Sequence, residues 1–335
     1  MKAAQIFLKE RPAGEPTKNN FDMREVDLPE LQDGEVLVEN KWMSVDPYMR
    51  LYLSSKSGAH APLPEGHPMT GGCCGIVSAS RCADVPEGTA VVSEVNGWRD
   101  RYVEKAENVR VVDASKVPLQ LHIGLLSRTG VTASAGMLDI LKPGTDDIVF
   151  VSSAAGGVGS VAVQLAKIAG AKVIGSAGTD AKGQWITNSL GVDHFINYRT
   201  EDDLAEAIRA CAPDGITRYF DNVGGNHLDA ALSTLRPRGV VAACGSIGLY
   251  NSGNYRAGPQ NYFAIMEKGI SILGFNATLW NHRRAEFLDY LEQNYLKGDI
   301  VWREHITDGL DHAVDAFLDV LTGQNIGKAL VKISS

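Results

Sequence analysis

The chain contains 335 residues, with 32 Lys and Arg against 40 Asp and Glu, so that its formal net charge is −8. This acidic balance argues against a general polyanion-binding protein, and 44% hydrophobic and 21% charged residues exclude a disordered or fibrous chain. The length suffices for about two domains, each with its own core. The 35 glycines exceed the average usage of roughly 7%, which predicts special backbone roles for some of them.

The cysteines and the apolar runs indicate the compartment. The five cysteines are an odd set without a CxxC pair, which disfavours a disulfide framework and a structural zinc lobe. The first apolar stretch already ends at Lys9, too early for a signal peptide, and the longest uncharged run, 148–166, is interrupted by glycines. We therefore expect a cytoplasmic protein that binds neither membranes nor nucleic acid.

The first third of the chain is predicted to form short β-strands. Its apolar segments are β-branched and are separated by Gly, Pro or Asp. They lie at 35–45, 75–80, 88–95 and 108–114. The Pro- and Gly-rich stretch 62–75 predicts a loop that leads into a strand, and the whole region indicates a barrel-like β lobe.

From about Ile123 the periodicity becomes helical, up to a stop at Pro143-Gly144. Apolar strands then alternate with helical patterns. The strands are predicted at 147–153, 171–178, 194–198, 218–223, 239–246 and 270–275, and the helices at 159–170, 181–190, 202–211, 226–236 and 259–268. This alternation is typical of βαβ units and of a parallel sheet covered on both faces.

The C-terminal segment is predicted to return to the first lobe. Amphipathic stretches at 283–298 and 310–323 precede a single strand at 328–334. Because a β lobe opens the chain and a lone strand closes it, we place that strand in the β lobe. The predicted fold class is α/β, with a β-rich domain and a doubly wound parallel-sheet domain.

The turn after the first predicted parallel strand carries a dinucleotide-binding pattern. It matches G-x-G-x-x-G with Ala154 at the first position, Gly156 at the second and Gly159 at the third. The pattern follows an apolar strand, opens a helix and leads into a second strand within about thirty residues, as the fingerprint requires. Gly156 would let the backbone approach a pyrophosphate, and Gly159 would allow the helix to pack closely on the sheet. A small-residue turn without a ligand is the alternative.

The end of the second predicted strand indicates which dinucleotide binds. NAD-selective sites place Asp or Glu there, whereas residues 176–178 are Ser-Ala-Gly. Lys182 follows within one helical turn, and Tyr198 with Arg199 ends the third strand, so these side chains can form a phosphate pocket. NADP(H) is therefore favoured over NAD(H), although Asp180 weakens this interpretation and an isolated lysine is commonly a solvated surface residue.

Four segments together resemble the zinc-independent medium-chain dehydrogenases/reductases. They are SVDPYMR at 44–50, VSSAAGGVGSVAVQLAKIAG at 151–170, FDNVGG at 220–225 and CGSIGLYN at 244–251. More narrowly, they resemble the branch of prostaglandin reductase/leukotriene B4 dehydrogenase, plant alkenal double-bond reductases and bacterial curcumin reductase. The resemblance implies a GroES-like catalytic domain from 1–123 and 300–335, a Rossmann NADP-binding domain from 124–299, and a homodimer formed through the edge strand 270–275.

The resemblance also implies which residues contact NADPH. They are Ala155, Gly156, Gly157, Val158 and Gly159 in the Gly-rich turn, Lys182, Tyr198, Asn222, the loop residues Cys244, Gly245, Ser246, Ile247 and Tyr250, and Asn325. Asn222 follows a strand at its carboxyl end, where ligands bind in open parallel sheets. An asparagine before glycine is more commonly a turn residue, which is the alternative for Asn222.

Zinc ligands are not expected. Zinc enzymes of the same fold need thiolate, imidazole and carboxylate groups that converge on the metal. The early strand carries Ser44-Val45-Asp46 without a cysteine, and His67 is not followed by glutamate. The adjacent Cys73 and Cys74 would point to opposite faces of a strand, so we expect one of them to pack in the core and His67 to make a local hydrogen bond.

The implied reaction is reduction of an α,β-unsaturated ketone or aldehyde, with hydride added to the β-carbon. Negative charge develops on the enolate oxygen, and donors aimed at that atom lower the barrier. The implied donors are the ribose hydroxyl of NADPH and a tyrosine, first of all Tyr262, for which a surface tyrosine packed on a helix is the alternative. Tyr48, Tyr52 and Tyr250 are candidate walls of the substrate cleft.

Two other functions stay open at this point. One is a quinone oxidoreductase of the same fold, which SVDPYMR disfavours, and the other is an NADPH-binding protein without turnover. The stretch 51–66 should line the pocket but matches no family pattern, so the sequence does not predict the substrate.

Overall fold

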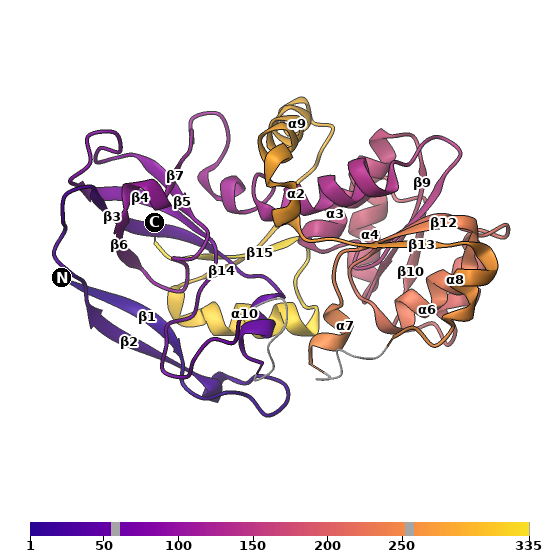
Figure 1. The fold of residues 1–335 in the computed structure, drawn as a ribbon, viewed down its shortest axis with the longest axis horizontal. Helices are drawn as coiled ribbons and strands as arrows, with labels where there is room; N and C mark the ends of the chain where they lie inside the picture. Colours follow the sequence, from indigo (N-terminus) through magenta and orange to yellow (C-terminus); the bar gives the residue numbers. More distant parts are fainter. Residues whose placement is uncertain (55–60, 252–257, 335) are drawn as a thin grey trace. The chain divides into compact units, whose positions relative to one another are not determined.

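The computed structural model describes residues 1–54, 61–251 and 258–334. The chain divides into two compact units, Met1–Gly124 with Glu304–Ser335, and Leu125–Arg303 (Figure 1). The first unit is built from both ends of the chain, and the second is one continuous segment. Among the described residues, none of the helices combines the length and the apolar character needed to span a bilayer.

The first unit contains a mostly antiparallel sheet of strand order β14-β15-β3-β4-β5-β7, with β6 also paired to β3. The strands are β3 (Glu35–Ser44), β4 (Cys73–Ser80), β5 (Ala90–Ser93), β6 (Arg101–Lys105), β7 (Arg110–Val111), β14 (Glu304–Asp308) and β15 (Lys328–Lys332). A separate antiparallel pair, β1 (Lys2–Leu8) with β2 (Phe21–Asp27), was not predicted. Strand β15 pairs antiparallel with β3, which confirms the predicted return of the last strand.

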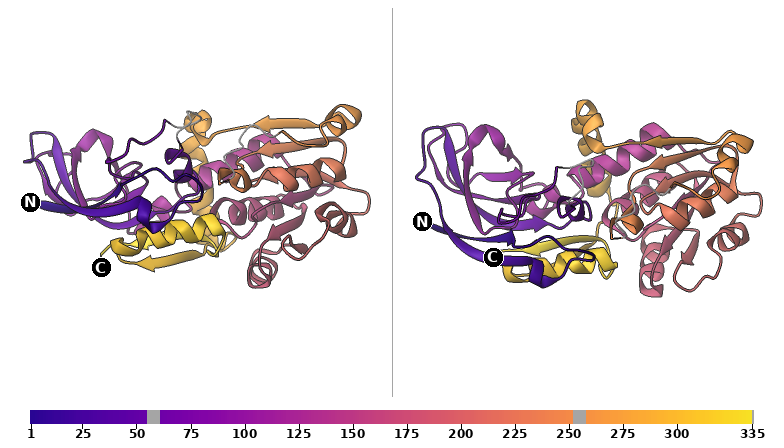
Figure 2. Two further views of the ribbon diagram at one scale, coloured as in Figure 1. Left: turned by 90° about the horizontal axis from the view of Figure 1, so that it is seen from below. Right: turned by 60° about the horizontal axis from the view of Figure 1, so that its bottom comes forward.

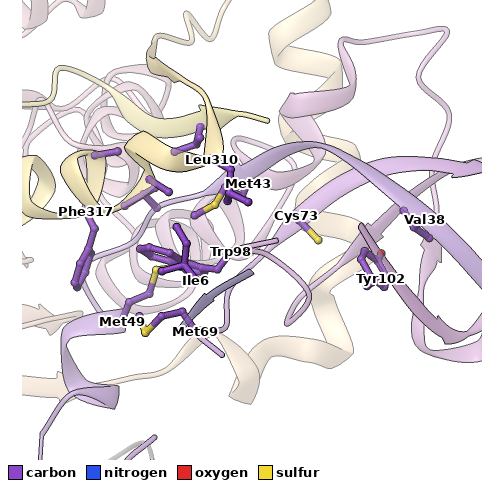
Figure 3. Close-up of a cluster of buried hydrophobic side chains, with 14 of the residues drawn as sticks. Ile6, Val38, Met43, Met49, Met69, Cys73, Trp98, Tyr102, Leu310 and Phe317 are labelled. Atoms are coloured by element: carbon purple, nitrogen blue, oxygen red, sulfur yellow. The ribbon is translucent and has the colours of Figure 1, made fainter. Parts of the chain in front are cut away.

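The core of the first unit gathers methionine side chains around aromatic rings. Met43, Met49 and Met69 are fully buried in one cluster with Trp98 and Phe317 (Figure 3). The rings of Trp98 and Phe317 meet edge to face, with centroids 5.9 Å apart. Flexible thioether side chains fill irregular space around rings. Helix α10 (Ala313–Thr322) supplies Phe317 and lies beside the β1–β2 pair, so the core joins the two ends of the chain (Figure 2).

The second unit contains a parallel sheet of strand order β10-β9-β8-β11-β12-β13. The strands are β8 (Ile148–Val151), β9 (Lys172–Ala177), β10 (His194–Asn197), β11 (Ile216–Asp221), β12 (Leu235–Ala243) and β13 (Ser271–Gly274). The chain builds outward from β8 through β9 to β10 and then returns to β11 on the other side of β8. Ligands of open α/β sheets bind beyond the carboxyl ends of the strands at such a reversal.

Helices connect these strands. They are α3 (Gly157–Ile168), α4 (Asp180–Leu190), α5 (Leu204–Cys211), α6 (Gly225–Thr234), α7 (Ile247–Tyr250) and α8 (Phe263–Lys268). Helix α3 contacts α4, and α5 contacts α6. Because crossovers between parallel strands are right-handed, connections that run in opposite directions along the sheet cover its two opposite faces. The predicted α/β class, with a β-rich part and a Rossmann-like parallel sheet, is confirmed.

The helical region predicted from Ile123 is divided in the structure. A 3-10 turn at Leu119–Ile123 is followed by α2 (Arg128–Ser134), which continues into a π-helical turn at Ala135–Leu141. The Ser127 hydroxyl accepts a hydrogen bond from the Thr129 N–H, and this cap places the start of the α-helix after the predicted start. Near the other end of the unit, α9 (Arg284–Lys297) occupies most of the predicted stretch 283–298.

Candidate functional site

The turn between β8 and α3 brings the backbone close to the carboxyl edge of the sheet. Ser153 has φ 52°, which is uncommon for a residue other than glycine. A Cβ on Gly159 would lie 2.1 Å from the Ser153 carbonyl oxygen, so only glycine lets the helix begin this close to the strand. Helix α3 begins after Gly156, and because glycine has no side chain to cap the helix, its first N–H groups can bind an anion. The remaining residues predicted in this turn are Ala155, Gly157 and Val158.

Gly178, directly after β9, faces side chains from the end of β10. A Cβ on Gly178 would lie 2.9 Å from the Tyr198 hydroxyl oxygen and 3.0 Å from Nε of Arg199. The half-buried Lys182 lies in the first turn of α4. Burial, and then the positive charge of Arg199, lower the pKa of the Lys182 ammonium group to about 8. The structure thus brings Tyr198 and Arg199 close to Gly178, and Lys182 lies near enough to Arg199 for their charges to interact.

Two cationic groups close together disfavour each other's charge, and a phosphate dianion between them would stabilise both. The acidic residue that weakened the prediction of NADP, Asp180, is engaged by a neighbour, because its Oδ1 accepts a hydrogen bond from Nδ2 of Asn197 at 2.8 Å. The donor set at the end of β9 therefore fits a 2′-phosphate.

Asp221 organises the loop after β11. Its buried Oδ1 accepts hydrogen bonds from the Tyr219 hydroxyl at 2.7 Å and from the N–H groups of Val223 at 2.9 Å and Gly224 at 2.8 Å. Burial raises the pKa of the Asp221 carboxyl group, and these hydrogen bonds oppose that shift. Sequence reasoning missed this residue, although an aspartate at the end of an apolar strand, directly before Asn-Val-Gly-Gly, is a turn signal.

The loop after β12 is fastened to the end of β11. The Asp221 carbonyl oxygen accepts the N–H groups of Cys244 at 2.9 Å and Gly245 at 3.0 Å. Burial and the Asp221 carboxylate raise the pKa of the Cys244 thiol to about 12, so the thiol is neutral at pH 7. The Ile247 N–H donates to the Asn222 carbonyl at 3.3 Å.

Two further residues of this loop face back toward glycines. A Cβ on Gly245 would lie 3.6 Å from the Tyr250 hydroxyl oxygen, and a Cβ on Gly224 would lie 3.2 Å from Cβ of Ser246. The loop residues predicted to contact NADPH therefore form one group beside Asn222.

Asn222 links the two strands at the reversal of the sheet. Its Nδ2 donates to the Ser152 carbonyl at 2.7 Å, and its N–H donates to the Ser152 hydroxyl oxygen at 2.9 Å. Ser152 directly follows β8, and Asn222 directly follows β11. The side-chain amide therefore fixes the end of β11 next to the Gly-rich turn.

Tyr262 lies in the second unit, at the residue before α8, and its side chain is 61% exposed. Its hydroxyl makes no hydrogen bond with the described residues, and the preceding residues 252–257 lie outside them. The adjacent segment is fastened to α6, because the Asp229 carboxylate accepts the Gln260 N–H at 2.7 Å. The structure does not place Tyr262 in contact with Asn222 or the Cys244 loop.

Tyr48, Tyr52 and Asn325 belong to the first unit. The rings of Tyr48 and Tyr52 meet edge to face, with centroids 5.8 Å apart, and pack on the core. Nη2 of Arg11 donates a hydrogen bond to the Leu63 carbonyl oxygen at 2.7 Å, which fixes the described end of the stretch 51–66. Nδ2 of Asn325 donates to the Gly327 carbonyl at 2.8 Å. Of the stretch 51–66, residues 55–60 lie outside the described residues.

The described parts of the chain hold no group of three or more His, Cys, Asp or Glu side chains that could bind a metal. Cys73 and Cys74 pack in separate clusters, which agrees with the predicted opposite orientation. Only one of them was expected in the core, but both are fully buried because each face of β4 is covered by an apolar cluster. Burial raises the pKa of both thiols. Nδ1 of the exposed His67 lies 3.4 Å from the Glu65 carbonyl oxygen, which is the predicted local contact.

Known proteins resemble this chain along nearly its whole length. Residues 4–112 match the family model of the N-terminal domain of oxidoreductase, and residues 157–293 match that of zinc-binding dehydrogenase. The chain is 37% identical to prostaglandin reductase 1 of Bos taurus over 97% of each chain. It is 32% identical to 2-alkenal reductase (NADP(+)-dependent) of Nicotiana tabacum, over 98% of this chain and 97% of the relative. The crystal structure of CurA in complex with NADPH from Vibrio vulnificus matches with a TM-score of 0.91 and 33% identity, over 99% of each chain.

Proposed function

The chain belongs to the medium-chain dehydrogenase/reductase family, in the branch of prostaglandin reductase and the 2-alkenal reductases, and we propose that it reduces the C=C bond of α,β-unsaturated ketones and aldehydes with NADPH. The observation that supports the choice of cofactor is that Tyr198 and Arg199 lie beside Gly178, with the ammonium group of Lys182 within the electrostatic reach of Arg199. The proposed NADP-binding Rossmann domain, 124–299, falls almost entirely within the second unit, Leu125–Arg303, and the proposed GroES-like catalytic domain, 1–123 with 300–335, corresponds to the first unit within a few residues at each boundary.

When bound, NADPH supplies the hydride that adds to the β-carbon of the substrate. The chain binds and orients the cofactor. The N–H groups at the start of α3 would bind the pyrophosphate, and Lys182, Tyr198 and Arg199 would bind the 2′-phosphate. Asn222, through its two contacts with Ser152, holds the end of β11 beside the Gly-rich turn. The loop residues Cys244, Gly245, Ser246 and Ile247 would border the nicotinamide ribose, and Asn325 would be a further cofactor contact.

Charge that develops on the substrate oxygen is stabilised by hydrogen-bond donors, without zinc. Tyr262 is the proposed donor, and its exposed hydroxyl, which makes no hydrogen bond with described residues, is available for this role. Tyr250 is a proposed substrate contact of the second unit, and Tyr48 and Tyr52 are those of the first. Ser44-Val45-Asp46 lacks the cysteine, and Pro68 stands in place of the glutamate after His67, that a zinc site would need, which supports a reaction without a metal ion.

The protein is proposed to be a cytoplasmic homodimer. Strand β13 lies at the edge of the parallel sheet, and its Ile272 and Leu273 are 38% and 45% exposed. An uncovered apolar edge strand favours pairing with a second copy. Sedimentation of the purified protein checks this, and a monomer at micromolar concentration would refute it. The five cysteines are all free, which agrees with a reducing compartment.

Oxidation of NADPH in the presence of 2-alkenals, arylidene ketones and quinones tests the proposed function. We expect turnover with the first two classes and formation of the saturated carbonyl product. Turnover with quinones alone would support the quinone oxidoreductase alternative. Tight NADPH binding without oxidation by any acceptor would support a binding protein without turnover.

A further inference from the structure

A column of aromatic rings runs through the second unit, from Asp221 to the end of β10. The Tyr219 hydroxyl donates to Asp221, and its ring stacks on Phe150 with centroids 5.0 Å apart and planes at 17°. Phe150 is parallel to His227, at 6.5 Å and 6°. His227 in turn meets Tyr198 edge to face, at 5.0 Å and 73°. Three of these rings are buried, and only Tyr198 is partly exposed.

His227 takes part in this column as a neutral ring. The side chain lies in the first turn of α6 and is 6% exposed. Burial lowers the pKa of its imidazole to about 4, so the ring is uncharged at pH 7. Its Nε2 is buried and has no hydrogen-bond partner among the described residues. The ring therefore contributes through packing, and the unpaired nitrogen is a cost that a phenylalanine would avoid.

Tyr198 is fixed from two sides. The buried His227 ring meets it from the core, and the Arg199 guanidinium lies 6.0 Å from the centre of its ring. In this position its hydroxyl oxygen lies 2.9 Å from the place where a Cβ on Gly178 would be. The orientation of the Tyr198 phenol thus depends on a ring that comes from a different strand end, after β11.

We propose that His227 is a positioning residue that sets the preference for NADPH over NADH by holding the Tyr198 phenol beside Gly178. The inference rests on the proposed binding of the 2′-phosphate by Lys182, Tyr198 and Arg199. NADPH and NADH differ only in that phosphate. A loss of Tyr198 orientation therefore weakens NADPH binding and leaves NADH binding nearly unchanged.

Dissociation constants of NADPH and NADH for the whole protein, measured by fluorescence titration at pH 7, test the proposal without relying on turnover. An edge-to-face aromatic contact predicts that His227→Ala weakens NADPH binding about three- to tenfold, with NADH binding changed less than about twofold. His227→Leu keeps apolar volume without a ring and should show the same shift. It replaces the alanine variant in the test if that variant does not fold. His227→Phe keeps the ring and should retain the wild-type ratio of the NADH dissociation constant to the NADPH dissociation constant.

Two control variants separate this role from others. Phe287→Ala removes a buried ring of the second unit that packs elsewhere, against Val131 and Ala277, and should lower the melting temperature without changing the ratio. Lys182→Met tests the phosphate site itself. A normal ratio in His227→Leu together with a lowered one in Lys182→Met overturns only the role of His227. A normal ratio in both variants overturns the proposed phosphate site as well.

Discussion

Two lysines, one in each unit, are withdrawn from solvent in opposite electrostatic surroundings. Lys328 of the first unit is 3% exposed, and its Nζ lies 3.0 Å from an Asp46 carboxylate oxygen and donates to the Val45 carbonyl at 2.6 Å. Lys182 of the second unit is half-buried beside the cationic Arg199, and its pKa is lowered to about 8. A buried lysine with a carboxylate partner cannot be removed alone without leaving an uncompensated charge, whereas a lysine next to a like charge is suited to an anionic ligand.

The largest expected effect is on stability, from Lys328→Met. This substitution leaves the Asp46 carboxylate without its cation, and we expect a loss of about 3–5 kcal/mol in the free energy of unfolding. Urea unfolding followed by tryptophan fluorescence, to which the buried Trp98 of the first unit contributes, measures the loss. The double variant Lys328→Met with Asp46→Leu should recover much of it. A single variant as stable as the wild type would remove the structural role assigned to this pair.

The same substitution at Lys182 is expected to act on binding instead. A charge-assisted hydrogen bond to phosphate is worth about 1.5–3 kcal/mol, so Lys182→Met should weaken NADPH binding about ten- to a hundredfold. NADH binding and the melting temperature should change little. Titration of the protein with both cofactors checks this, and an equal loss for NADPH and NADH would contradict a contact with the 2′-phosphate.

The lowered pKa of Lys182 also predicts a pH dependence. Below pH 8 the free protein already carries the charged ammonium group that the phosphate needs, and above it the lysine must take up a proton on binding. NADPH affinity should therefore fall about three- to tenfold between pH 7 and pH 9, while NADH affinity stays level. The stability of the free protein should depend on pH in the opposite direction. Burial of the charged Lys182 lowers the free energy of unfolding below pH 8, and this cost is lost as the pH rises from about 8 to 10.5. An identical pH profile in Lys182→Met would assign the dependence to another group.

The smallest expected effect concerns Tyr262, whose side chain is 61% exposed. If its hydroxyl donates to the developing enolate oxygen, Tyr262→Phe should lower kcat/KM for an enone by about 1 kcal/mol, or roughly fivefold. Cofactor affinity should not change, since Tyr262 is not among the side chains around Gly178. Steady-state kinetics with a 2-alkenal provide the measurement. Unchanged kinetics would leave Tyr262 as the surface residue that its exposure suggests.

Local patterns predicted the architecture because each strand and crossover helix is specified within a short segment. The β-rich ends, the parallel strands and the return of the last strand to β3 are confirmed. The start of the helix after Ile123 was wrong, since a serine cap at Ser127 decides it and periodicity does not locate caps. The β1–β2 pair was missed, because its two strands are joined by an irregular segment with no hairpin signal.

For the candidate site, the sequence by itself determined which strand ends carry glycines, cations and polar turns. Parallel strands end at one edge, so Lys182, Tyr198 and Asn222 could be assigned to that edge from their spacing and from a family resemblance. Only the tertiary structure decided which side chains contact one another, at this edge and elsewhere in the molecule. The contacts of His227 with Tyr198, and of Lys328 with Asp46, join residues from separate elements. Burial and pairing of such groups depend on packing between distant segments, which no local pattern encodes.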